Sequence, residues 1–413
     1  MGKKFIIILL LKIIDSQIII PFKNNLNFSS LTEENFYNKL SNMNITTNLL
    51  IGNPSKEILF NIKLSSFHLI CLSYNSKNGK NIESFNEQQS SSFSSKDKDF
   101  EFYHLEETEF CKRSKENFIL NNNIKVDDLN FFLSSDLEKN QSGILGLKLS
   151  DVYPEYNFIN QLKSKNLISS FYMFFQFKNL NEGNIIIGNY PYEKDHINFQ
   201  TAKIKISSLN QKYCFEINFV KYGNNVIVEK QEFIFNFENF FIYANSDLKK
   251  VMDEKFFNKL LEEKKCEAKI MKFSMSDIVF YVCDDSININ KLDDLKFISE
   301  ELKYEFIYKP KDMFIKQNKK LFFIIGFTDY WRKQWFLGYQ FLTKYQIIFN
   351  QDKKIIGFYI KKNLPINLII SIIFGFIIIG LLIYIYKILK TKRKIRANEL
   401  IEDFDYLPQN LNK

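Results

Sequence analysis

The side chains best suited to metal or nucleophilic chemistry are few and far apart in this chain. Its 413 residues include three histidines and five cysteines, and no Cys-x-x-Cys pair occurs. Zinc sites need such residues at short, regular spacings, so we expect no metal ion and no other cofactor. The residues concerned are His68, His104, His196, Cys71, Cys111, Cys214, Cys266 and Cys283.

The composition predicts a large aromatic core built from strands. The chain has 44 Phe, and aromatic side chains favour β-structure. With only 13 Gly and 7 Pro, it does not have the composition of a disordered protein. The net charge of +9 is spread thinly through lysine, and no basic stripe alternates with aromatic residues. Nucleic-acid binding needs such a stripe, so we expect no nucleic-acid partner.

Both ends of the chain carry segments that stand outside the predicted fold. In residues 1–17 two lysines precede a short apolar run and a polar end, which indicates a secretory signal peptide. A buried strand or a signal anchor is the alternative. Residues 365–386 contain no charge and are long enough to cross a bilayer as a helix. Residues 387–396 hold six cations and no acid, so the positive-inside rule places the tail at 387–413 in the cytoplasm.

This arrangement predicts a single-pass type I membrane protein. Its ectodomain is then extracellular or lumenal, at the cell surface or in an endolysosomal compartment. A GPI anchor is disfavoured, because a basic tail follows the apolar span. The polar residues 397–413 are expected to be disordered. Sequons at Asn27, Asn44 and Asn140 predict a glycosylated ectodomain.

The ectodomain reads as one short apolar strand after another, from about residue 45 to residue 362. Helical spacing of apolar residues occurs at 151–166 and, more clearly, at 245–264. An Asn-Ser pair at the start of the second stretch suits a helix N-terminus. Residues 75–99 are polar and of low complexity, which predicts a surface loop.

Several local motifs of the ectodomain occur in an order that is typical of one family. Most of them place a glycine at a turn or at the end of an apolar strand. They are 51–54 (IGNP), 85–93 (FNEQQSSSF), 142–147 (SGILGL), 183–189 (GNIIIGN), 335–345 (WFLGYQFLTKY) and 347–358 (IIFNQDKKIIGF). In this order, and over nearly the whole ectodomain, the chain resembles the pepsin-like aspartic peptidases.

The resemblance implies a mainly β, bilobal acid-protease fold with a few short helices, followed by one C-terminal transmembrane helix. It implies an N-terminal lobe at 45–195 and a C-terminal lobe at 196–362. Residues 18–44 are then a short pro-segment or an N-terminal extension. The recurrence of one motif position near residues 63 and 236 fits two related lobes.

The resemblance also implies a pairing of the cysteines. Cys266 and Cys283 lie where the family's second lobe usually carries a disulfide. A bond between Cys71 and Cys111 is a looser expectation, and it leaves Cys214 unpaired.

The resemblance places the family's two catalytic aspartates at Lys63 and Asn236. The family's chemistry resembles acid–base catalysis by two carboxylates that share one proton and activate a water molecule. A protonated lysine has no lone pair, and an amide does not titrate, so neither residue can take that role. Other family positions are changed too: Leu64, Ser65, Phe237 and Glu238 follow the two sites, and Tyr339 replaces an aspartate of the closing block.

Three residues are candidates for the substrate cleft: Ser65, Tyr103 and Glu238. Tyr103 matches the flap tyrosine of the family, although residues 104–109 contain no glycine, which implies a stiffer hairpin. Residues i and i+2 of a strand share a face, so Glu238 can point the same way as Asn236. We expect Glu238 to form an ion pair with Lys63 across the lobes. Glu57 and Asp247 are the other acids close enough in sequence to replace a catalytic aspartate.

These residues favour a membrane-anchored, non-catalytic homologue that binds a peptide or protein in the cleft between its lobes. The alternative is an active aspartic endopeptidase, as the family resemblance implies. A further alternative is a structural surface or adhesion protein that uses its outer surface.

Overall fold

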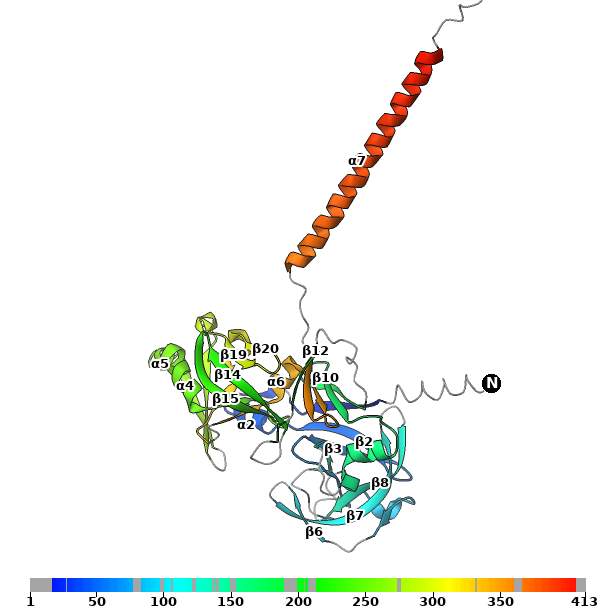
Figure 1. Ribbon diagram of the computed structural model, residues 1–413. Helices are drawn as coiled ribbons and strands as arrows, with labels where there is room; N and C mark the ends of the chain where they lie inside the picture. The colour runs from blue at the N-terminus through cyan, green and yellow to red at the C-terminus, as the bar shows by residue number, and fades with distance from the viewer. Residues whose placement is uncertain are drawn as a thin grey trace, which may run out of the picture. The chain divides into compact units, whose positions relative to one another are not determined.

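The computed structural model of the chain consists mainly of β-strands (Figure 1). It describes residues 17–26, 28–76, 83–96, 100–104, 107–120, 124–135, 137, 141–148, 154–188, 199–203, 205–206, 213–272, 276–330, 333–359 and 366–405. All of the predicted signal peptide except Gln17 lies outside these residues. Residues 1–360 form one compact unit and residues 361–413 a second one.

The first sheet contains 14 strands. Its main path runs in the spatial order β12, β26, β25, β10, β11, β1, β2, β3, β9, β4, β8, β7 and β5, and β6 pairs with β7. Their bounds in this order are Phe199–Lys203, Ile355–Tyr359, Gln346–Asn350, Tyr172–Phe177, Glu182–Ile187, Ile18–Asn24, Ile45–Ile51, Lys56–Lys63, Gly143–Gly146, Leu69–Leu72, Ile124–Ser134, Glu107–Leu120, Ser94–Ser95 and, for β6, Phe100–His104.

The second sheet contains 12 strands. Its main path is β20, β19, β14, β15, β24, β16, β23, β18, β22 and β21, with β13 paired to β14 and β17 paired to β18. The bounds are Tyr304–Tyr308, Leu295–Ser299, Tyr213–Tyr222, Asn225–Phe235, Gln334–Leu337, Ile242–Ala244, Ile325–Phe327, Asp277–Asp284, Lys320–Phe323, Phe314–Gln317, Lys205–Ile206 for β13 and Cys266–Lys272 for β17.

The same four-strand arrangement occurs once in each sheet. In the first sheet β3 runs parallel to β9, β9 antiparallel to β4, and β4 parallel to β8. In the second sheet β15 runs parallel to β24, β24 antiparallel to β16, and β16 parallel to β23. This internal repeat confirms the prediction of a mainly β fold with two related lobes, which we call the first and second lobe after their sheets.

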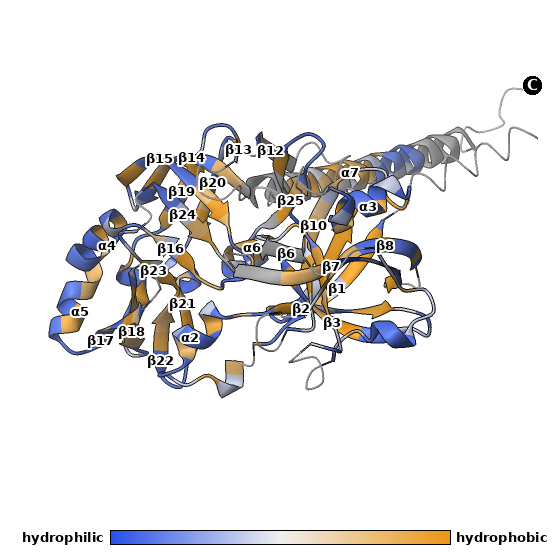
Figure 2. Cartoon of the chain, turned by 90° about the horizontal axis from the view of Figure 1, so that it is seen from below, coloured by the Kyte–Doolittle hydropathy of each residue, from blue (hydrophilic) through white to orange (hydrophobic). Residues whose placement is uncertain are grey.

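One large hydrophobic cluster connects the two sheets. This cluster of buried apolar residues includes members of both, among them Ile62 in β3 of the first sheet and Phe235 in β15 of the second. Many strands carry runs of hydrophobic residues, and α4 and α5 alternate between hydrophilic and hydrophobic residues (Figure 2). The aromatic-rich composition therefore forms the interior, as predicted. The hairpin β25–β26 belongs to the second half of the chain, but its strands pair within the first sheet.

Helices are short in the part of residues 1–360 that the structure describes. The predicted stretch at 151–166 contains η4 (Pro154–Tyr156) and α3 (Phe158–Ser164). The stretch at 245–264 forms α4 (Ser246–Met252), a π turn (Asp253–Phe257) and α5 (Asn258–Glu262), and the Asn245 side chain caps α4 by accepting from the Leu248 amide. The remaining short helices are η1 (Phe28–Ser30), α2 (Phe36–Ser41), η2 (Glu87–Gln89), η6 (Ile289–Lys291), η7 (Pro310–Asp312) and α6 (Tyr339–Lys344).

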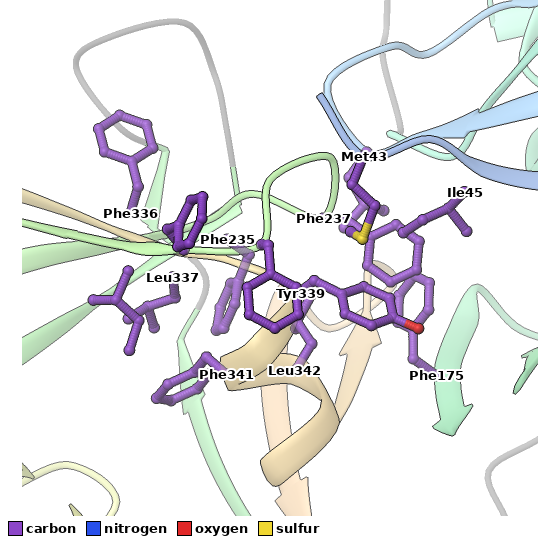
Figure 3. Close-up of a cluster of buried hydrophobic side chains, with 14 of the residues drawn as sticks. Met43, Ile45, Phe175, Phe235, Phe237, Phe336, Leu337, Tyr339, Phe341 and Leu342 are labelled. Carbon is purple, nitrogen blue, oxygen red and sulfur yellow. The ribbon is translucent and has the colours of Figure 1, made fainter. Parts of the chain in front are cut away.

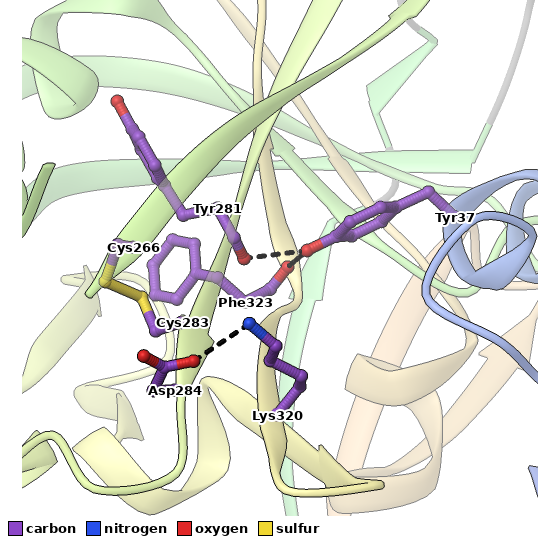
Figure 4. The surroundings of a disulfide bond; sticks show 7 residues. All are labelled: Tyr37, Cys266, Tyr281, Cys283, Asp284, Lys320 and Phe323. Carbon is purple, nitrogen blue, oxygen red and sulfur yellow. Dashed lines mark hydrogen bonds and ion pairs between the residues drawn. A yellow bond between two sulfur atoms is a disulfide. The ribbon is translucent and has the colours of Figure 1, made fainter. Parts of the chain in front are cut away.

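One disulfide bond links Cys266 to Cys283, directly across the β17–β18 pair (Figure 4). This confirms the expected pairing. The expected bond between Cys71 and Cys111 is wrong. Their strands, β4 and β7, both pair with β8 and lie on either side of it, so they are about two strand spacings, or roughly 10 Å, apart. Disulfides need Cα atoms within roughly 7 Å, and Cys71, Cys111 and Cys214 are buried outside any disulfide.

The second unit contains one long helix, α7 (Ile366–Asp405). Residues 374–394 of this helix are long and apolar enough to cross a membrane, and none of this stretch is buried. The chain therefore carries a candidate membrane anchor at its C-terminal end, as predicted. The expectation that residues 397–413 are disordered is wrong for residues 397–405, because α7 continues to Asp405.

Candidate functional site

Lys63 and Asn236 lie at corresponding points of the two four-strand motifs. Lys63 ends β3, in register with Gly146 of the parallel strand β9. Asn236 directly follows β15, whose last residue Phe235 is in register with Leu337 of the parallel strand β24. Gly338 directly follows β24 in the chain. Each site thus lies beside a glycine at the end of a parallel neighbour.

The loops that follow the two sites take the same path over these glycines. A Cβ atom on Gly146 would lie 2.6 Å from the backbone of His68, five residues after Lys63. A Cβ atom on Gly338 would lie 2.2 Å from the carbonyl of Phe241, five residues after Asn236. Only glycine permits backbones to approach so closely. The glycine positions and the strand pattern therefore make Lys63 and Asn236 structurally equivalent.

The two loops meet through Ser65 and Glu238, which each lie two residues after a site. The Ser65 hydroxyl donates to Glu238 Oε1 at 2.5 Å, and the Ser65 amide donates to the same oxygen at 3.3 Å. The expected Lys63–Glu238 ion pair is wrong: within the described part of the chain, no carboxylate lies at ion-pair distance from Lys63. A hydrogen bond, not a pair of opposite charges, joins the lobes here.

Asparagine side chains stabilise the loop of the second lobe. The Asn236 amide oxygen accepts from the Glu238 amide at 3.2 Å, and the Asn239 oxygen accepts from the Phe241 amide at 2.8 Å. The Asn239 amide group also donates to the Tyr243 hydroxyl at 2.5 Å. Asn236 thus turns its oxygen toward its own loop, where it acts as a turn residue.

An aromatic cluster fills the space beneath this loop (Figure 3). Phe237 is fully buried, and its ring lies 4.4 Å from Phe175 and 5.7 Å from Tyr339, between ring centroids. Phe22 and Phe177 contact the same ring. Tyr339 is fully buried as well, and burial raises the pKa of its hydroxyl. The position where the family has an aspartate is therefore part of the core, and it carries no charge.

The other predicted residues lie elsewhere in the fold or outside the residues that the structure describes. Glu57 lies near the far end of β3, six residues before Lys63, or roughly 20 Å along the strand. Asp247 lies in the first turn of α4. Tyr103 lies in the β6–β7 hairpin, in register with Thr108, but the structure does not describe its side chain. Among the sequons, Asn44 is exposed, and Asn27 and Asn140 lie outside the described residues.

The N-terminal segment also contributes to this site, which the sequence had not led us to expect. Phe22 of β1 packs edge-to-face on Phe237 at 5.9 Å, and Phe28 packs on Phe240 at 6.1 Å. The signal was present in the alternation of Ile18, Ile20 and Phe22, which are all buried on one face of β1. The apolar run of residues 1–17 precedes this strand directly and hides the alternation.

Two related β lobes with equivalent loops in contact define the class of bilobal, pepsin-like proteins. The family model for eukaryotic aspartyl proteases matches residues 46–360, and the chain belongs to this family. None of the curated proteins searched matches the chain.

Proposed function

We propose that this protein is a catalytically inactive, membrane-anchored member of its family that binds a peptide or protein ligand between its lobes. The observation that carries the proposal is the equivalence of Lys63 and Asn236. They stand at the ends of β3 and β15, on either side of the contact between the two loops. Neither side chain can exchange a proton with water as a carboxylate does.

The other groups at the site do not restore the missing chemistry. Glu238 is the one carboxylate among the described residues that bonds across the two loops, and its Oε1 accepts both donors of Ser65. Two carboxylates must face each other for one to stay protonated while the other is ionised. A single acid in contact with a hydroxyl lacks that arrangement, so hydrolysis of peptides is not expected.

The scaffold for a ligand is nevertheless retained. The family is named for action on proteins, and the match extends over both lobes and the β6–β7 hairpin. An extended peptide that lies along strand edges gains backbone hydrogen bonds without any catalytic group. These features support a peptide or protein as the ligand. The basic residues after the span support a type I orientation, with the lobes outside the cell or in a lumen.

Binding and cleavage can be tested separately. The full chain in detergent is titrated with a statine-containing peptide, which mimics the intermediate of aspartic peptidases, while cleavage is followed on a fluorogenic peptide pool at acidic pH. The proposal predicts saturable binding of peptides and no cleavage. Cleavage that the statine peptide inhibits would show an active endopeptidase, and absence of all peptide binding would favour a structural surface protein.

A restored variant serves as the matched control. Lys63→Asp and Asn236→Asp are combined with Leu64→Thr, Ser65→Gly and Glu238→Gly, and Phe237 is kept because its ring is fully buried. Gain of cleavage by this variant, with none in the parent chain, supports loss of the carboxylate pair as the cause of inactivity. Cleavage by the parent at the rate of the variant contradicts it.

A further inference from the structure

Residues 18–43 contact both lobes, although they precede the region matched by the family model. Their first part is β1, which pairs over six residues with β11 and then with the start of β2. Ile18, Ile20 and Phe22 of this strand are at most 1% exposed. The segment therefore forms an inner strand of the first sheet and part of its core.

The second part of the segment docks on the second lobe (Figure 4). The Tyr37 hydroxyl donates to the carbonyl of Tyr281 at 2.8 Å and to that of Phe323 at 3.2 Å. The Phe36 ring stacks on Phe322 at 3.8 Å between centroids, which places α2 beside β22. Burial raises the pKa of Tyr37, so its hydroxyl stays protonated and continues to donate.

Side chains of the second lobe hold the connection between β1 and α2. The Gln317 amide group donates to the carbonyls of Phe28 at 2.7 Å and Leu31 at 2.6 Å. Lys269 forms an ion pair with Glu33 at 3.3 Å. The second lobe thus binds this segment through backbone groups, through charge and through stacked rings.

We propose that residues 18–43 are a permanent tie between the lobes and are not a removable pro-segment. Loss of the segment would strip the hydrogen bonds from the edges of β11 and β2 and uncover the rings of Phe237 and Phe322. Unpaired buried backbone groups are costly, so the folded lobes retain the segment even when the chain is cut after it. The inference is independent of whether the protein cleaves peptides.

A cut chain tests the proposal directly. A recognition sequence for a site-specific protease is inserted at the exposed residue Asn42 of the full chain, and the purified protein is cut in detergent. The N-terminal fragment is expected to co-elute one to one with the remainder and to separate only in denaturant. Separation of the fragment from a remainder that stays folded would overturn the proposal.

One further measurement applies even when the insertion impairs folding, and a second extends the test on the cut chain. In the uncut protein from a eukaryotic secretory host, the mature N-terminus is expected at or before Ile18, and an N-terminus at or after Asn44 would overturn the proposal. In the cut protein, Tyr37→Phe is expected to speed release of the fragment severalfold, whereas Tyr74→Phe, at a 37% exposed tyrosine, is expected to leave it unchanged. Equal release rates for the two variants contradict the proposed role of Tyr37.

Discussion

The contact between Ser65 and Glu238 makes a quantitative prediction about how the lobes hold together. Glu238→Ala removes a carboxylate that accepts two hydrogen bonds from the other lobe. Hydrogen bonds to charged groups typically contribute about 1.5–3 kcal/mol each, and less when partly exposed. Both residues are half-buried. We therefore expect Glu238→Ala to lower the free energy of unfolding by about 2 kcal/mol.

A double-mutant cycle isolates the hydroxyl–carboxylate bond. Ser65→Ala removes the hydroxyl and retains the amide donor, so the two substitutions together should show a coupling energy of about 1 kcal/mol. Unfolding in urea is followed by tryptophan fluorescence, to which Trp335, fully buried in β24 of the second lobe, contributes.

A distant serine provides the control for this cycle. Ser95 is exposed in β5 of the first lobe, and Ser95→Ala should be additive with Glu238→Ala within about 0.5 kcal/mol. Additivity of Ser65→Ala with Glu238→Ala to the same tolerance would refute the reasoning, because it would show that the hydroxyl–carboxylate bond contributes nothing to the stability of the folded protein.

Three further predictions concern the core, the disulfide and alkaline pH. Phe237→Ser should lower the free energy of unfolding by about 3–5 kcal/mol, because it leaves a cavity among packed rings. A thermal melt in which this free energy falls by only a few tenths of a kcal/mol would contradict the packing described. Replacing Cys266 and Cys283 by serine should cost about 3 kcal/mol through loss of a closed loop, and an unchanged urea midpoint would contradict this. Burial raises the pKa of Tyr222 from 10.0 to about 12, so its contribution to stability is present below pH 10 and is lost as pH rises toward 12. The loss of stability over this range should be smaller in Tyr222→Phe, and identical pH profiles of the free energy of unfolding would show that Tyr222 does not titrate in this way.

The sequence predicted the two lobes well because family motifs record backbone requirements. Gly146 and Gly338 must lack a Cβ atom for the loops to pass, so these positions keep a recognisable pattern. The helix at α4–α5 was also predictable, since its apolar spacing and its Asn245 cap are local signals.

The errors concern features that depend on which strands lie side by side. Cys71 and Cys111 looked suitable for a disulfide until the strand order placed β8 between them. Likewise, charge alone suggested that Glu238 would pair with Lys63. In the folded chain a hydroxyl and an amide of Ser65 converge on the carboxylate. Charge-assisted hydrogen bonds from a short side chain cost little conformational entropy, whereas an ion pair must order a long lysine.

The N-terminal segment was underestimated because its role depends on partners distant in sequence. The pairing of β1 with β11 joins Ile18 to Ile187, and Tyr37 donates to carbonyls of the second lobe. No local sequence motif predicts contacts between residues so far apart in the chain. A tyrosine beside a phenylalanine on a six-residue helix is typical of many amphipathic surfaces.

Peptide cleavage by the unaltered full chain is the most direct test of the central claim. The purified protein is incubated at acidic pH with a broad fluorogenic peptide pool, alongside an active member of the same family as a control, with and without a statine peptide. Because Lys63 and Asn236 occupy the two equivalent strand ends, we predict no statine-sensitive cleavage. Cleavage that the statine peptide blocks, and that Glu238→Gln abolishes, would contradict the account by showing that another acid performs the chemistry.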